Sequence, residues 1–160
     1  MKREEITEQV KTWLSKETEQ QEWKIAINDD DPSYYYCYSI VNESDTILFT
    51  ICIEKKIDRV IVMNNITFSK QDGTNYKLSR EKGKYWIDLK LQLLNLGIDV
   101  KAIPDVERLE TIQLRKVIYF DGCSRDRFVN DVRNIIDSSE IPELILGNYS
   151  NYMNEKIQKD

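Results

Sequence analysis

The segment YFDGCSRDRF, residues 119–128, concentrates residue types that can bind an anion. The pattern predicts a strand, an Asp-Gly turn and then a helix, so that backbone N–H groups and the positive end of the helix dipole point outward. Two arginines fall in the first turn of that helix, where they add positive charge. The residues that we assign to this candidate anion site are Tyr119, Asp121, Ser124, Arg125 and Arg127.

The same segment also has a purely structural interpretation. Asp121 and Gly122 suit a tight turn, and Ser124 suits the N-cap of the helix that follows. Both arginines can then pair with neighbouring carboxylates instead of a ligand. The sequence leaves the anion site and the structural turn open as alternatives.

Three consecutive aspartates at positions 29–31 form a second group of potential ligands. With Glu43 and Asp45 across a predicted hairpin, they offer the oxygen atoms that Ca²⁺ prefers. The spacing does not fit an EF-hand loop, because it has no glycine in the middle and no glutamate at the twelfth position. We interpret the run as a solvated turn and expect neither a metal nor another cofactor.

The cysteines Cys37, Cys52 and Cys123 are too few and too widely spaced for a disulfide framework or a zinc motif. Cys37 and Cys52 fall on one face of a predicted hairpin and are candidates for cross-strand neighbours. We interpret them as small buried thiols. Cys123 precedes a predicted helix, whose N-terminus can lower the pKa of a thiol, so a redox role for Cys123 stays open.

The composition argues against several classes of function. The 160 residues include no histidine, which removes histidine acid–base catalysis and catalytic triads and nearly all catalytic zinc sites. Neither the phosphate-binding GxxxxGK[ST] loop nor the GxGxxG and GxSxG patterns occur. A net charge of −5 argues against nucleic-acid binding, which depends on neutralising phosphates with Lys and Arg. We therefore expect a protein that is not an enzyme.

Hydropathy gives no sign of membrane insertion or export. No apolar run approaches the ~18 residues needed to cross a bilayer, and the first residues lack the apolar core of a signal peptide. A hydrophobic content of 41% and a charged content of 32% are typical of a globular domain. We expect one cytoplasmic domain over residues 1–160, with a frayed tail at 153–160.

Hydrophobic periodicity indicates the elements that hold these residues. Residues 3–17 carry an apolar stripe at helical spacing, and short alternating runs typical of strands follow. Parity places four residues of YYYCYSIV on one strand face: Tyr34, Tyr36, Tyr38 and Ile40. A hairpin sets this face beside the one that carries Phe49 and Ile51. The tyrosines therefore pack on a sheet, whose pleated surface suits their flat rings.

The second half of the chain predicts a further set of alternating elements. A turn at KQDGTN precedes a helix over residues 79–96, which ends at Gly97. Two strands, IDVKAIP and LETIQLRKVIYF, lead to the last long helix after Ser124. The order is helix, several antiparallel strands, helix, two strands, helix. This order predicts an α+β fold with helices packed on one face of an antiparallel sheet.

The helix predicted over residues 79–96 is apolar around most of its circumference. Its narrow polar stripe consists of Lys84, Asp88, Gln92 and Asn95. The apolar surface is too wide for one sheet face, so either another helix or a second copy of the chain covers the remainder. We predict a homodimer and assign its interface to Trp86, Leu89 and Leu93.

Two segments, YWIDLKLQLLNLGIDVKAIP and IYFDGCSRDRFVNDVRNII, resemble an archaeal family of uncharacterised proteins classed as a domain of unknown function. The family pattern combines a tryptophan-led, leucine-rich helix ending in Gly, an extended segment closed by Ile-Pro, an aromatic-Asp-Gly turn and an Arg-Phe pair. The matching residues are Trp86, Gly97, Pro104, Tyr119, Asp121, Gly122, Arg127 and Phe128. The element order also resembles the type III secretion chaperone fold, which commonly forms homodimers.

These resemblances imply a chaperone-like α+β fold and bring no catalytic residues with them. Our leading interpretation is a non-catalytic cytoplasmic homodimer that binds an unknown protein partner as a chaperone or adaptor, without nucleic acid or membrane. One alternative is a small-molecule or anion-binding module centred on residues 121–127. The other is an enzyme that works without histidine. Fold resemblance alone does not decide among them.

Overall fold

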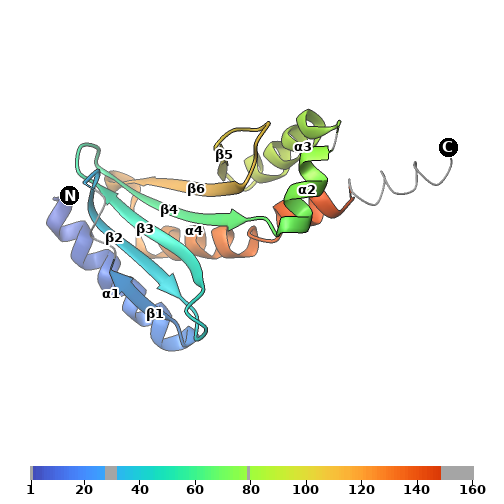
Figure 1. Cartoon of the computed structure of the whole chain (residues 1–160). Helices are drawn as coiled ribbons and strands as arrows, with labels where there is room; N and C mark the ends of the chain where they lie inside the picture. The colour runs from blue at the N-terminus through green and yellow to red at the C-terminus, as the bar shows by residue number, and fades with distance from the viewer. Residues whose placement is uncertain (1, 28–31, 79, 149–160) are drawn as a thin grey trace, which may run out of the picture. The chain divides into compact units, whose positions relative to one another are not determined.

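A computed structural model describes residues 2–27, 32–78 and 80–148. The fold is α+β, with a six-stranded antiparallel sheet in the order β1-β2-β3-β4-β6-β5 and helices on it (Figure 1). The chain divides into two compact units, each made of two stretches of sequence. Unit 1 comprises residues 1–64 and 115–136, and unit 2 comprises residues 65–114 and 137–160. The strands β4 and β6 contribute residues to both.

Unit 1 contains the first helix, the first strands and the last long helix. Its elements are α1 (Arg3–Gln21), β1 (Lys24–Ile27), β2 (Tyr34–Val41), β3 (Ile47–Glu54), most of β4 (Arg59–Thr67), the end of β6 (Thr111–Tyr119), η1 (Phe120–Gly122) and nearly all of α4 (Arg125–Asp137). Figure 1 shows α1 running alongside β1 and β2.

The helix α1 extends one turn beyond the predicted residues 3–17. At its start, the backbone N–H of Lys2 donates to the carboxylate of Glu5 at 3.1 Å, which satisfies a donor that the helix leaves open. At its end, Glu22 adopts a left-handed conformation with φ of 57°, and the N–H of Trp23 donates to the Thr18 carbonyl at 3.2 Å. This closing turn ends the helix.

The hairpin of β2 and β3 brings together the strand faces that the sequence predicts. Tyr38 lies opposite Ile51, and Cys37 lies opposite Cys52. Tyr38 is 3% exposed and Tyr36 is half-buried, whereas Tyr35 is 38% exposed, which confirms the predicted faces at these positions. The strand register shifts between Tyr34 and Tyr36, however.

That register shift corrects the prediction for Tyr34. A bulge inserts an extra residue and so reverses the side of the sheet on which the preceding residues lie. Tyr34 accordingly packs with Cys37 and Cys52 and not with Tyr36 and Tyr38. Parity counting assumes a regular strand and therefore placed Tyr34 on the wrong face.

The helices α1 and α4 cover the same face of the unit 1 sheet. On that face, the Lys11 ammonium lies 4.7 Å from the centre of the Tyr36 ring. The rings of Trp13 in α1 and Phe128 in α4 are 5.6 Å apart, so the two helices also contact each other. The opposite sheet face carries a separate buried cluster: Cys37, Cys52, Ile61 and Met63, with Tyr34 and Val117 packed against it.

The strand β6 shows the predicted alternation, with one unforeseen member. The apolar residues predicted for one face are all buried: Ile112, Leu114, Ile118 and Phe120. Lys116 shares that parity and is only 8% exposed. Its ammonium Nζ lies 2.6 Å from Oδ1 of Asp131 in α4, so a buried ion pair replaces an apolar contact at this point.

In addition to its parts of β4 and β6, unit 2 contains α2 (Lys70–Leu78), α3 (Lys82–Leu94), β5 (Asp99–Ile103) and a helical segment at residues 141–148. The segment KQDGTN, predicted as a turn, begins α2 instead. The backbone N–H of Asp72 donates to Ser69 Oγ at 3.1 Å, which caps the helix. Tyr76 is completely buried, and this packing stabilises a helix that the local sequence does not favour.

The helix α3 is shorter than the predicted span of residues 79–96. It begins at Lys82, and the chain turns after it at Gly97, whose φ of 65° is in the left-handed region that glycine tolerates best. The N–H of Ile98 donates to the Leu93 carbonyl at 3.0 Å, and the chain continues into β5. This tight connection packs α3 against β5 within unit 2.

Candidate functional site

The predicted anion site at the end of β6 has the predicted local structure. The chain passes through η1, and α4 begins at Arg125. Ser124 Oγ accepts the backbone N–H of Arg127 at 3.4 Å, as expected for an N-cap. Asp121 and Tyr119 are exposed. The turn and the cap therefore follow the sequence pattern.

Both arginines of this predicted site contact groups of the protein itself. Arg125 Nη2 lies 3.3 Å from Glu17 Oε1 in α1. Arg127 Nη1 donates to the Gly122 carbonyl at 3.4 Å, and its Nε lies 3.9 Å from Asp131 Oδ2. These are the contacts expected from the structural interpretation of the segment. The structure thus keeps Ser124 and Arg127 together but directs Arg125 toward α1.

Cys123 at the start of α4 does not have the environment of a reactive thiol. The side chain is 7% exposed, and burial raises its pKa to about 11, although the nearby Arg127 acts in the opposite direction. A thiol with this pKa is almost entirely protonated at neutral pH. A helix N-terminus can lower the pKa of a thiol, but burial is the largest effect on Cys123 and its pKa is raised.

The predicted interface residues of α3 divide between the inside and the surface of unit 2. Leu89 and Leu93 are completely buried within the chain and are not available to a partner, while Trp86 is half-buried. The exposed positions are instead Ile87 at 58%, Leu91 at 57% and Leu94 at 69%. These three residues follow the spacing i, i+4, i+7 and therefore form one stripe along the helix.

The helical segment at residues 141–148 contacts α3. Tyr85 in α3 donates its hydroxyl to the Pro142 carbonyl at 3.0 Å, which joins the two helical segments. A groove of about 470 Å³ is lined by Glu81, Lys84, Asp88, Leu91, Gln92, Ile145 and Asn148. Leu144, next to Ile145, is 63% exposed. We call Ile87, Leu91 and Leu94 the apolar surface of unit 2.

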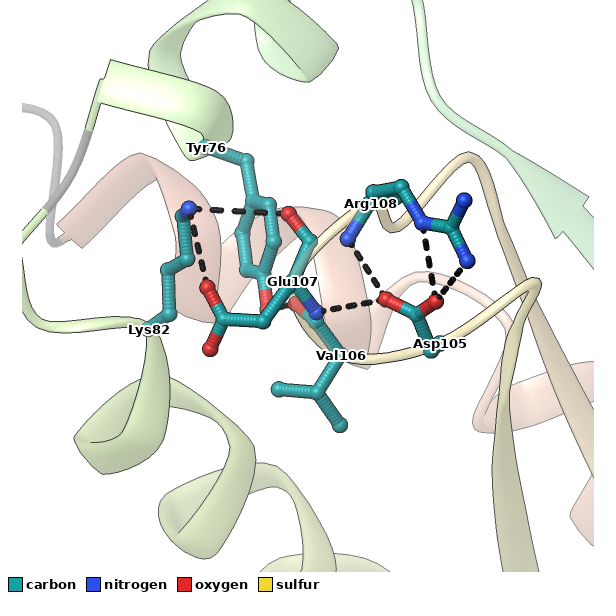
Figure 2. A network of polar contacts seen from close by, with 6 residues as sticks. All are labelled: Tyr76, Lys82, Asp105, Val106, Glu107 and Arg108. Carbon is teal, nitrogen blue, oxygen red and sulfur yellow. Dashed lines mark hydrogen bonds and ion pairs between the residues drawn. The ribbon is translucent and has the colours of Figure 1, made fainter.

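A network of polar contacts holds the ends of α2 and α3 to the loop after β5 (Figure 2). Tyr76 points from α2 to this loop and donates its hydroxyl to the Val106 carbonyl at 2.5 Å. At the start of α3, Lys82 Nζ lies 3.4 Å from the carboxylate of Glu107 and 3.5 Å from its carbonyl oxygen. These contacts fix where α3 begins, and so which of its faces is turned outward.

Within that loop, Asp105 organises the backbone. Its Oδ1 accepts the N–H groups of Glu107 at 3.0 Å and Arg108 at 2.9 Å, and Arg108 Nε donates to its Oδ2 at 2.9 Å (Figure 2). The hydrogen bonds from Arg108 lower the pKa of Asp105. Burial raises the pKa of Tyr76 to about 12, with Glu107 and Asp105 adding to the effect. Tyr76 is therefore a neutral hydrogen-bond donor at physiological pH and serves to position the loop.

The aspartates at positions 29–31, considered above as calcium ligands, lie outside the described residues. Asp45, named with them, forms an ion pair with Lys24 at 3.6 Å. Over residues 2–27, 32–78 and 80–148, no group of three or more His, Cys, Asp or Glu side chains could hold a metal ion. The helices within the same ranges are all too short or too polar to cross a bilayer.

The helix α3 has the excess of apolar surface that its sequence predicts, but its exposed residues are Ile87, Leu91 and Leu94, whereas Leu89 and Leu93 are buried. The residues on its two sides are equally apolar, so composition does not distinguish the buried stripe of Leu89 and Leu93 from the exposed stripe of Ile87 and Leu91. The distinguishing signal is the turn at Gly97, because a short connection determines which side of α3 faces β5.

Comparisons with known proteins give a family and a fold without a function. A family model described as "Uncharacterized conserved protein (DUF2299)" matches residues 6–144. No curated protein matches the chain. A crystal structure of an uncharacterized protein from Methanothermobacter thermautotrophicus is similar, with a TM-score of 0.70 and 18% identity over 88% of this chain and 96% of that chain. That likeness shows the fold alone, whereas the family match, which spans most of the sequence, shows that the chain belongs to the DUF2299 family of uncharacterized conserved proteins.

Proposed function

We propose that this protein is a non-catalytic cytoplasmic homodimer with a chaperone-like or adaptor role, and that its two copies meet through the apolar surface of unit 2. The observation that carries the proposal is the exposed stripe of Ile87, Leu91 and Leu94 on α3. Large apolar side chains that are contiguous and more than half exposed are typical of a surface that another protein covers. The lack of histidine in the chain supports a role without catalysis.

The apolar pattern of α3 favours a second copy of the chain as the occupant. In an antiparallel contact centred at the level of Leu89, Ile87 of one copy lies opposite Leu91 of the other, so the same stripe is covered on both copies. The exposed stripe also has the spacing of a coiled-coil seam, which suits packing of helix against helix.

Sedimentation velocity and light scattering at micromolar and lower concentrations test the homodimer. We expect a mass of twice the 19.0 kDa of one chain. Leu91→Glu places a charge within the apolar stripe of the contact and is expected to give the single-chain mass. Ile57→Glu is the matched control, because Ile57 is an exposed isoleucine of unit 1, 45% exposed, and its replacement leaves the dimer unchanged. A mass of 19.0 kDa for the unmodified protein at every concentration would contradict the proposal.

A further inference from the structure

We propose that Cys37 and Cys52 form a reactive dithiol that a low-molecular-weight disulfide oxidises reversibly to an intramolecular disulfide. The two residues are direct cross-strand partners in β2 and β3, and both carry thiols. Their Sγ atoms are 2.9 Å apart, about 0.9 Å more than the length of a disulfide bond. The pairing of the strands therefore already holds the two Sγ atoms close to bonding distance.

The surroundings of the pair indicate which thiol reacts first. Both lie on the sheet face opposite α1 and α4, in a cluster with Ile61 and Met63. Cys37 is 7% exposed and Cys52 is 1% exposed, so a small reagent reaches Cys37 more readily. The strand is also irregular beside Cys37, because the register of β2 shifts between Tyr34 and Tyr36. Cys37 is therefore the attacking thiol and Cys52 the resolving thiol.

The reaction consists of two thiol–disulfide exchanges. The Cys37 thiolate attacks one sulfur of the reagent RSSR, so that a Cys37–SR bond forms, the reagent S–S bond breaks and RS⁻ leaves. The Cys52 thiolate then attacks Sγ of Cys37 and displaces the second RS⁻. Each leaving thiolate takes up one proton. Overall, two protein thiols and RSSR give one protein disulfide and two RSH, and two electrons pass from the protein to the reagent.

Cys123 provides an internal reference for this reaction. It lies between η1 and α4 and is not a member of the buried cluster that contains Cys37 and Cys52. Cys123 is as exposed as Cys37, at 7%, but it has no second cysteine of this cluster beside it and burial raises its pKa to about 11, so we expect it to stay unreacted while the pair is oxidised.

The experiment exposes the native, reduced protein to oxidised glutathione, followed by an acid quench, unfolding and alkylation of the remaining thiols. Intact mass then gives the thiol count. We expect the three thiols of the reduced chain to fall to one, and reduced glutathione to restore all three. In Cys123→Ser the count should fall from two to zero, while Cys52→Ser should accumulate a glutathione adduct on Cys37. Cys37→Ser should form at least tenfold less adduct than Cys52→Ser.

Two results would overturn the proposal. One is that all three thiols of the native protein persist under conditions that consume the thiols of the same chain in urea. The other is a lasting glutathione adduct on Cys37 of the unmodified protein without an intramolecular disulfide. Peptide mapping of the oxidised protein decides between the second result and the expected Cys37–Cys52 bond.

Discussion

Two buried tyrosines differ in what their hydroxyl groups contact, and this difference determines what each contributes to stability. The Tyr76 hydroxyl donates to the Val106 carbonyl at 2.5 Å. The Tyr38 hydroxyl is buried and makes no hydrogen bond of good geometry within the described residues. Burial raises the pKa of Tyr38, and the nearby Lys11 ammonium offsets part of that rise. A buried hydroxyl group without a hydrogen-bond acceptor lowers the free energy of unfolding.

Replacement of each tyrosine by phenylalanine is therefore expected to have opposite effects. Tyr76→Phe should lower the free energy of unfolding by about 1–2 kcal/mol, because the Val106 carbonyl loses its donor. Tyr38→Phe should leave stability unchanged or raise it by up to about 1 kcal/mol. Urea denaturation measures both values. A clear loss of stability in Tyr38→Phe would show that the Tyr38 hydroxyl is hydrogen-bonded after all.

The ion pair between Lys116 and Asp131 gives a second prediction at the residue scale. Both side chains are mostly buried, with 9% and 14% of their area exposed. Lys116→Met leaves the Asp131 carboxylate with the more distant Arg127 and is expected to cost about 3 kcal/mol. The double variant Lys116→Met/Asp131→Leu removes both charges and should recover most of that loss. Equal stability of the two variants in urea would show that Asp131 needs no partner.

At the scale of elements, Gly83 in α3 and Gly97 in the turn after it allow a matched pair of substitutions. Gly97 has a φ of 65°, whereas Gly83 lies within the helix, and a Cβ atom added at either position meets nothing within 4 Å. Gly97→Ala should lower the free energy of unfolding by about 1 kcal/mol, because a left-handed conformation is strained for alanine. Gly83→Ala should raise the free energy of unfolding by about 0.5–1 kcal/mol, since alanine favours a helix. Denaturation midpoints that shift in the same direction for both would refute this prediction.

The local sequence was sufficient to predict those elements whose hydrophobic pattern is regular. For the hairpin of β2 and β3, alternation predicted which strand faces pair and made Cys37 and Cys52 candidates for cross-strand neighbours, as they are in the structure. The local sequence was insufficient where tertiary packing determines which element forms. The helix α2 contains Gly73 and few apolar residues, so nothing local outweighs the interpretation as a turn, and burial of Tyr76 stabilises the helix instead.

The candidate surfaces were predictable in kind but not in detail. Periodicity identified an excess of apolar residues on α3, yet the choice between Leu89 and Leu91 depends on the packing against β5. The contacts of Arg125 with Glu17 in α1 join residues 108 positions apart, and no spacing rule connects them. Long-range pairs of this kind could therefore not be predicted from the sequence.

For the whole molecule, the buried tyrosines predict how stability depends on pH. The pKa of Tyr76 is raised to about 12, and burial also raises the pKa of Tyr85 and Tyr38. In the unfolded chain, tyrosine loses its proton near pH 10. Between about pH 10 and pH 12 the unfolded state therefore binds fewer protons than the folded state, and the free energy of unfolding falls as pH rises.

Urea midpoints measured from pH 8 to pH 11.5 test this dependence. We expect a plateau below about pH 9.5 and a steady decline above pH 10. Tyr76→Phe lacks one of the responsible groups and should show a shallower decline, whereas Tyr119→Phe, at an exposed tyrosine, should follow the unmodified protein. A midpoint that stays constant to pH 11.5 would contradict the raised pKa values.

The position of Lys116 affects which register β6 adopts in the sheet. A slip of two residues would keep the parity of β6 and still turn apolar side chains inward, because Leu114 and Ile118 flank Lys116 on the same face. Such a slip would move the ammonium away from Asp131, to which it is held at 2.6 Å. The hydrophobic pattern thus selects a face, and the buried charge selects one alignment among those that share it.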